Sequence, residues 1–597
     1  MSKLAVILLT LLGIGGCQHQ ASLTHIAPAE TSVSQPSPAS MQLQQLIDQD
    51  WQLKLARYPY LAERQGVANA AARLVDMSST ALADYQAQQL AMLNALNNLD
   101  SASLSHQDKI NAQILTYQLQ DSTDMYRFGD HYMPITAEGG FHTSISQISD
   151  ITISNEADAQ AYFARLNALP TYFKQQTLWL QQGLALGITP PRVTLKGIED
   201  TVSAYQVDVN ESTYYQPFTQ LPASMPAEQQ AQLQQQAQQL IQDKVLPLYD
   251  DFYWFLTEQY LPQTRTSIAA SDMPDGVEFY ENRIKHYTTL NMTSEQVHQL
   301  GLLEVARIRA EMQAVIEELA FQGSFDDFLH FLRTDPQFYA KTPQELLKHA
   351  AYIAKQADAV LPKYFATLPR TPYGIKEVPA QIAPKYTTGR YSGASNDTEA
   401  GYYWVNTYAL DKRPLYEMEA LTLHEAVPGH HLQIALNQEQ ADLPNFRRYS
   451  YISAFGEGWG LYAEYLGIEA GFYQDPYSNF GRLTYEMWRA VRLVVDTGLH
   501  MQGWSRQQAI DYMASNTALS LHNVTTEIDR YISWPGQAVS YKIGELTIKR
   551  LRQQAQYALG DKFDIRQFHD AVLINGSVPL SILEQQVKAY IERVNQA

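Results

Sequence analysis

The segment 421–433 (LTLHEAVPGHHLQ) holds the residue types that a zinc hydrolase needs. Such an enzyme uses neutral imidazoles as metal ligands, leaves one metal position open for water, and places a carboxylate beside that water as general base. His424 is followed directly by Glu425, and His430 and His431 come shortly afterwards. The segment therefore predicts two histidine ligands, with Glu425 as the base.

The spacing of these histidines excludes one unbroken helix. In the common zinc helix the two ligands lie four residues apart, but in this chain that position is Pro428. Six or seven residues along a helix span roughly 9 to 10.5 Å, too far for two ligands that each lie about 2 Å from one ion. Pro428 cannot donate a helical hydrogen bond, and Gly429 tolerates unusual dihedrals. We expect the helix to break at these two residues; the alternative is a polar helix end without a metal.

A third ligand is expected from the segment 455–464 (FGEGWGLYAE). Glu457 lies 33 residues after His424, among glycines that let two backbones approach, and Trp459 follows to pack beside a buried site. Glu464 is the competing acid, but we expect it to be a solvated helix residue. Glu457 is therefore the predicted third ligand.

These two segments together resemble the large bacterial family of uncharacterised domains called DUF885. That family is similar to the gluzincin zinc peptidases, which include the angiotensin-converting-enzyme, thimet-oligopeptidase and thermostable-carboxypeptidase groups. The resemblance extends over most of the mature chain and implies a large helical ellipsoid with a deep substrate channel. In those groups a Gly-His pair supplies the second ligand, which favours His430 over His431.

Two residues are candidates for stabilising the oxyanion of a tetrahedral intermediate. The segment 534–544 (WPGQAVSYKIG) resembles the place where the related enzymes position a tyrosine, so the resemblance assigns this role to Tyr541. His500 is the alternative, and it shares one helical face with Arg492 and Asp496. This stripe is either a network that orients metal ligands or an internal salt-bridged face.

The elements that must position these residues are predominantly helical. Helical spacing of apolar residues and capping signals predict helices over 79–99, 226–243 and 293–319, the last opening with a Thr293/Gln296 capping box. The best strand is 401–408 (GYYWVNTY), which either pairs with an extended peptide or packs in the core. The predicted fold class is mainly α with a small β element.

The N-terminus predicts a location at the bacterial cell envelope. Residues 1–16 contain an apolar run that is too short to span a bilayer but is typical of a secretion signal. Small residues then precede Cys17, the only cysteine, as in a bacterial lipobox. We therefore expect a lipid anchor on Cys17, on the periplasmic side of the outer or inner membrane. The alternative is an ordinary signal peptide with an incidental cysteine.

The remaining chain divides into a tether and a body. Residues 17–41 are rich in Ser, Thr, Gln, Ala and Pro and predict a flexible tether, which leaves 42–597 as one helical zinc-peptidase-like domain. The excess of 62 acidic over 43 basic residues argues against a nucleic-acid partner.

The predicted function is zinc-dependent hydrolysis of peptide bonds in short peptides, of oligopeptidase or carboxypeptidase type. The predicted zinc ligands are His424, His430 and Glu457. One alternative is a zinc amidase that acts on cell-wall peptides, and another is a non-catalytic peptide-binding lipoprotein. Glu425 argues against the second alternative, because a purely structural zinc site needs no base beside its ligands.

Overall fold

The computed structural model describes residues 36–596, apart from 138, 381, 384–385 and 395–397. The predicted signal segment 1–16 and Cys17 lie outside the described residues, as does most of the predicted tether. The first helix begins at Pro38, so the helical body starts slightly before the expected boundary at residue 42.

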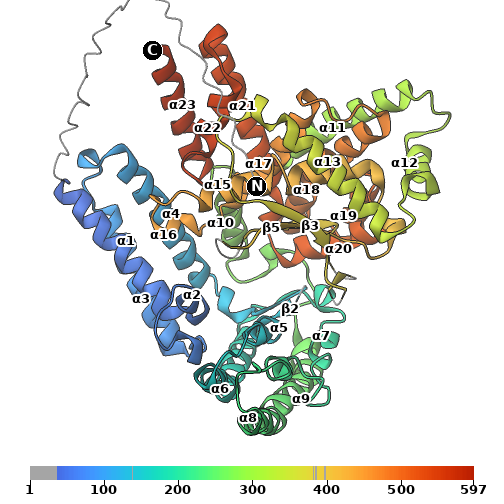
Figure 1. The fold of residues 1–597 in the computed structure, drawn as a ribbon. Helices are drawn as coiled ribbons and strands as arrows, with labels where there is room; N and C mark the ends of the chain where they lie inside the picture. Colours follow the sequence, from blue (N-terminus) through green and yellow to red (C-terminus); the bar gives the residue numbers. More distant parts are fainter. Residues whose placement is uncertain (1–35, 138, 381, 384–385, 395–397, 597) are drawn as a thin grey trace, which may run out of the picture.

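An N-terminal arm runs along one side of the molecule, shown in blue in Figure 1. It consists of α1 (Pro38–Arg57), α2 (Pro59–Arg64), α3 (Ser79–Asn97) and α4 (His106–Arg127). Helix α3 confirms the predicted helix over 79–99. Its Ser78 cap accepts a hydrogen bond from the backbone N–H of Ala81, which satisfies one of the free donors at the helix start.

A second lobe follows, at the bottom of Figure 1. It contains the short pair β1 (Ile135–Thr136) and β2 (Gly139–Gly140), then α5 (Phe141–Ser144), α6 (Glu156–Leu186), α7 (Glu199–Ser203), α8 (Ala227–Leu240) and α9 (Leu246–Trp254). Helix α8 confirms the helix predicted over 226–243. The lobe has its own hydrophobic core, in which Phe141, Phe173, Tyr249 and Phe252 are buried. No linker in the sequence marks this lobe, so its separate core was not predicted.

The C-terminal part holds most of the largest core, which also includes residues of the N-terminal arm such as Leu43 and Ile114. Its helices are α10 (Gly276–Thr288), α11 (Ser294–Glu318), α12 (Phe325–Thr334), α13 (Pro343–Tyr364), α14 (Met418–Glu425), α15 (His430–Gln438), α16 (Asn445–Arg448), α17 (Ser453–Glu469), α18 (Pro476–Met501), α19 (Arg506–Asn516), α20 (Leu521–Ser533), α21 (Ser540–Leu559), α22 (Ile565–Leu573) and α23 (Leu580–Gln596). The capping box of α11 forms as predicted, with Thr293 and Gln296 each accepting from the other's backbone N–H. The mainly α fold is confirmed, and none of the described helices is long and apolar enough to cross a membrane.

One three-stranded sheet provides the predicted β element. Its strands β3 (Tyr373–Glu377), β4 (Gly389–Ser392) and β5 (Gly401–Val405) lie in the order β3-β5-β4. The predicted strand is therefore the central one, with β3 parallel and β4 antiparallel to it. Because both sides of β5 are paired, the suggestion that an extended peptide adds to this strand is wrong. Strand β4 lies at one edge of the sheet.

Candidate metal centre

The helix that carries His424 breaks where the sequence predicted. Helix α14 ends at Glu425, and α15 begins at His430. At Gly429 a side-chain Cβ would lie 1.9 Å from the carbonyl oxygen of His424, so the turn is this tight only because residue 429 is glycine. Trp459 of α17 is fully buried, and its indole N–H donates to the carbonyl of Pro428 at 2.8 Å. The turn is thus held from the helix that carries the third candidate ligand.

The three predicted ligands converge from three different helices. The Nε2 atoms of His424 and His430 each lie 3.5 Å from Oε2 of Glu457, and all three atoms lie within 4.8 Å of one another. Four ligands around a tetrahedral zinc at 2.0–2.1 Å stand about 3.3–3.4 Å apart. The two distances to Glu457 are close to this spacing, and two imidazoles with a carboxylate are a donor set that suits zinc.

The neighbouring histidine has a different role. The Nδ1 atom of His431 lies 2.8 Å from the hydroxyl of Tyr391 on β4, and its ring stands 4.5 Å from the ring of Tyr373 on β3. Burial lowers the pKa of His431 to about 4. The structure therefore brings His430, not His431, to Glu457, as the resemblance implied.

The electrostatics of the cluster favour a positive charge at its centre. Burial lowers the pKa of His424, but hydrogen bonds to Glu457 and Glu464 outweigh it and raise the pKa to about 9. Burial raises the pKa of Glu457, but His430 and His424 outweigh it and hold that pKa well below its usual range. A buried cluster of this kind is stabilised by a cation, either a proton or a metal ion.

Glu464 is not the solvated residue that the sequence analysis expected. Its side chain is buried, and Oε1 lies 2.7 Å from Nδ1 of His424. A carboxylate in this position orients an imidazole ligand and fixes its tautomer. The missed signal is the spacing: Glu457 and Glu464 are seven residues apart, so they share one face of α17. Gly460 lies between them on that face, and a Cβ there would stand 2.5 Å from the His424 ring.

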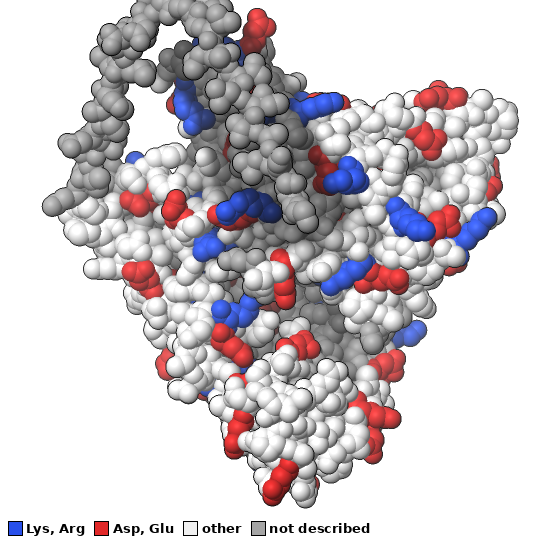
Figure 2. Space-filling model, in the orientation of Figure 1, with Lys and Arg blue, Asp and Glu red and all other residues white. Residues whose placement is uncertain are grey.

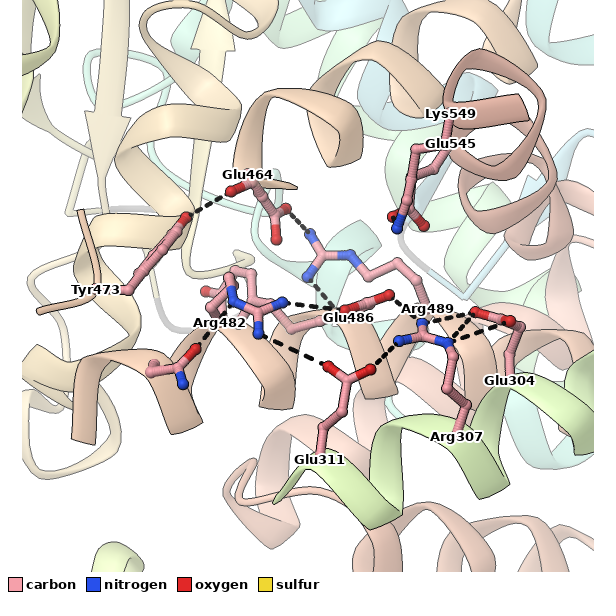
Figure 3. A network of polar contacts seen from close by, with 12 residues as sticks. Glu304, Arg307, Glu311, Glu464, Tyr473, Arg482, Glu486, Arg489, Glu545 and Lys549 are labelled. Atoms are coloured by element: carbon pink, nitrogen blue, oxygen red, sulfur yellow. Dashed lines mark hydrogen bonds and ion pairs between the residues drawn. The ribbon is translucent and has the colours of Figure 1, made fainter. Parts of the chain in front are cut away.

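One charged and one neutral polar group hold Glu464 in place, as Figure 3 shows. The guanidinium of Arg489 on α18 lies 3.5 Å from Oε1 of Glu464. The hydroxyl of Tyr473 donates to the backbone carbonyl of Glu464 at 3.0 Å. The same view contains an ion-pair network between α11 and α18, in which Glu486 binds both Arg307 and Arg482. The group that orients His424 is thus fixed by the core.

The carboxylate of Glu425 lies beside the cluster and, within the described part of the chain, is held by a single hydrogen bond. It is 8% exposed, and its Oε2 accepts one hydrogen bond, at 2.7 Å, from the backbone N–H of Tyr391 on the outer strand β4. His424, Glu425, His430 and Glu457 all line a cleft of about 2070 Å³. This central cleft is bounded by the N-terminal arm, the α5–α9 lobe and the C-terminal part. The resemblance implied a deep substrate channel, and this cleft is the candidate for it.

Two tyrosines reach the central cleft near the cluster. Tyr541, at the start of α21, lines it and has its ring 4.2 Å below the guanidinium of Arg492. Tyr451, which the sequence analysis missed, donates its hydroxyl to Oε1 of Glu457 at 2.8 Å. It also lines the cleft, and nothing in the sequence distinguished it from the other 37 tyrosines.

The structure does not bring His500 to the cluster. Its ring is fully buried, with Nδ1 accepting from the backbone N–H of Ala270 and Nε2 lying 3.0 Å from the carbonyl of Tyr531. Both nitrogens are therefore occupied by backbone, which leaves neither for an oxyanion. Its neighbours on the same face, Arg492 and Asp496, bind Glu527 and Tyr280 respectively. The stripe is an internal polar face of α18.

Comparisons with known proteins identify the family of the chain. The family described as "Bacterial protein of unknown function (DUF885)" matches residues 59–587. The chain belongs to the DUF885 family. No curated protein matches it. The relationship of DUF885 to the gluzincins stays a prediction.

Two solved structures share the fold of this DUF885 protein. A "putative lipoprotein" from Colwellia psychrerythraea is 29% identical, with a TM-score of 0.84 over 92% of this chain and 100% of that chain. A "putative lipoprotein of unknown function" from Shewanella oneidensis is 17% identical, with a TM-score of 0.71 over 92% and 99%. The second likeness concerns the fold alone. The first agrees with the lipobox that the sequence predicts at Cys17.

Proposed function

We propose that this protein is a zinc-dependent peptidase that hydrolyses short peptides at the bacterial cell envelope. The observation that carries the proposal is the cluster of His424, His430 and Glu457, whose ligand atoms stand at zinc-like separation with Glu425 beside them in a cleft. A site that only stabilises the fold is closed by its protein ligands. This cluster has three ligands and opens on a large cleft, as a catalytic site does.

In this proposal each residue of the site has one role in hydrolysis. His424, His430 and Glu457 would hold the zinc, which when bound acts as a Lewis acid toward water and the peptide carbonyl. Glu425 takes the proton of the attacking water and passes it to the leaving amine. Tyr541 donates a hydrogen bond to the developing oxyanion. Tyr451 holds the second oxygen of Glu457 and so keeps the other oxygen directed at the two histidines.

The surroundings of the cluster favour a short, extended substrate. The cleft is bounded by three parts of the molecule, which favours a short peptide over a folded protein as the substrate. The outer strand β4 lines the cleft and reaches Glu425 through Tyr391. Among the described residues no strand pairs with the outer side of β4, and such an edge is a template for an extended peptide.

The proposed location depends on the lipid anchor. We expect Cys17→Ala to release the protein from the membrane fraction or to block its processing, because the thioether-linked lipid would be lost. Labelling of growing cells with a palmitate analogue checks this. Wild type should be labelled and the variant should not. An unlabelled wild type would contradict the lipid anchor without affecting the enzymatic proposal.

The role of Glu464 leads to a prediction about metal affinity. Glu464→Gln keeps the shape but weakens the hydrogen bond that orients His424, so zinc affinity should fall by about 10- to 100-fold. A competition titration with a zinc-binding dye measures the change. The matched control is Glu469→Gln on the same helix, whose carboxylate binds Arg552 instead. If both variants bind zinc like wild type, Glu464 does not orient a ligand.

The proposal as a whole is tested by removing and restoring the metal. Purified soluble protein should cleave a mixed library of short peptides, lose this activity when stripped by a chelator, and regain it with one equivalent of zinc. The products are identified by mass spectrometry. A zinc-restored protein that binds peptides and leaves them all intact would favour the non-catalytic alternative.

A further inference from the structure

The central cleft is basic although the protein is acidic. Among the described residues, nine Lys and Arg side chains line it but only four Asp and Glu do, while the whole chain has 43 basic and 62 acidic residues. Two of the four acids are Glu425 and Glu457 at the cluster. On the outside, Figure 2 shows acidic side chains over the lobe at the bottom of the view. A basic cleft in an acidic protein concentrates anionic ligands.

One of these basic residues lacks the partner that its burial requires. Eight arginines among the described residues are more than nine-tenths buried. Six of them form ion pairs with Asp or Glu, and Arg447 donates to Asn111 and to the carbonyl of Asn575. The eighth, Arg413, lines the cleft and is 8% exposed.

The guanidinium of Arg413 is nearly unpartnered. Its Nη1 donates to Oγ1 of Thr388 at 3.4 Å, and its buried Nε has no partner among the described residues. Glu417 is close in sequence, but in the part of the chain that the structure describes no hydrogen bond or ion pair joins it to Arg413, and its own buried Oε1 has no partner; burial raises the pKa of Glu417 to about 8. Burying a cation without a counterion is costly. A carboxylate that accepts two parallel hydrogen bonds from the guanidinium offsets this cost.

The position of Arg413 relative to β4 indicates which carboxylate fits. Thr388, its partner, directly precedes β4, and Tyr391, three residues further on, bonds to Glu425. Three residues of strand span roughly 10 Å, the length of two to three residues of an extended peptide. A peptide that runs antiparallel to β4 directs its carboxyl end toward Thr388. A parallel peptide would place its cationic amino end there, against Arg413.

We propose that Arg413, with Thr388, binds the C-terminal carboxylate of the substrate, so that the protein removes short fragments from the carboxyl end of peptides. This inference rests on the proposed function, because it uses Glu425 to mark the bond that is cut. The inference specifies which end of the peptide is recognised: the protein cuts the bond two or three residues before a free carboxyl terminus.

The test compares three N-acetylated hexapeptides on the zinc-loaded protein: a free acid, its C-terminal amide, and an amide with one internal Glu. For wild type, kcat/KM on the free acid should be at least about 30-fold higher than on either amide. Removing one partner of a buried, hydrogen-bonded charge pair weakens binding by at least this factor. Arg413→Gln should lose the advantage of the free acid and cleave all three peptides with similar kcat/KM. Arg506→Gln, which removes a cleft arginine already paired with Asp529, should behave as wild type.

Stability and binding measurements keep the result interpretable. Since Arg413→Gln removes an unpaired buried charge, its melting temperature should not fall, which distinguishes a binding role from a structural one. Calorimetric binding of the acid and the amide should show the same preference as the kinetics. If wild type hydrolyses none of the three peptides, the proposed function fails, while the binding measurements still decide the role of Arg413. The inference would be overturned by equal kcat/KM values for the acid and its amide. It would also be overturned if the amide with the internal Glu were cleaved as fast as the free acid.

Discussion

Glu425→Gln is expected to cleave short peptides about 10²- to 10⁴-fold more slowly than wild type. The substitution preserves the size and the hydrogen bond from Tyr391 but removes the proton acceptor. Since Glu425 is not among the three ligands, the variant should fold, retain zinc and still bind peptides. Initial rates on the peptide library, with zinc content measured on the same samples, check this.

A matched acid on the same helix serves as the control for this prediction. Glu419 lies on α14 six residues before Glu425, and its carboxylate accepts from the backbone N–H of Tyr473 instead of facing the cleft. Glu419→Gln should therefore cleave the library at the wild-type rate. If Glu425→Gln also cleaves as fast as wild type, the base is another residue and the proposed mechanism is wrong.

Removal of two ligands is expected to abolish zinc binding. The double change His424→Ala and Glu457→Ala leaves His430 alone, and a single imidazole does not hold zinc against dilution or a weak chelator. Elemental analysis of purified wild type should give about one zinc per chain, and the double variant should give close to none. Activity on the library should disappear with the metal.

The neighbouring histidine provides the control for the ligand set. His431→Ala should keep its zinc, because His431 faces Tyr391 and not Glu457, whereas His430→Ala should lose most of it. Stoichiometric zinc in the double variant, or loss of zinc in His431→Ala alone, would remove the proposed ligands from the site.

The candidate cluster was largely predictable because its constraints are local. The residue types at 424–430 and the Pro-Gly pair between the histidines allowed only a broken helix, and α14 and α15 end and begin accordingly. Caps such as the Thr293/Gln296 box act through neighbouring residues, so the start of α11 was predicted to within one residue. The choice of His430 needed the resemblance, since spacing alone does not separate adjacent histidines.

Contacts between distant segments were not predictable. The sequence placed His500 on a helical face, but its partners are backbone atoms 230 and 31 residues away. Glu464 shares a face of α17 with Glu457, yet only the packing of α14 against α17 shows that His424 lies there. Strand β4 has four residues and begins with glycine, too short for an alternating pattern, so the strand that reaches Glu425 was missed.

The most direct test of the account is a crystal of the soluble body grown with zinc and a peptide-like inhibitor, measured at the zinc absorption edge. We predict one strong anomalous peak between His424 Nε2, His430 Nε2 and Glu457 Oε2, with the metal-binding group of the inhibitor beside Glu425. A peak at another place, or no peak at these three atoms with zinc in excess, would contradict the assignment of this cluster as a zinc peptidase centre.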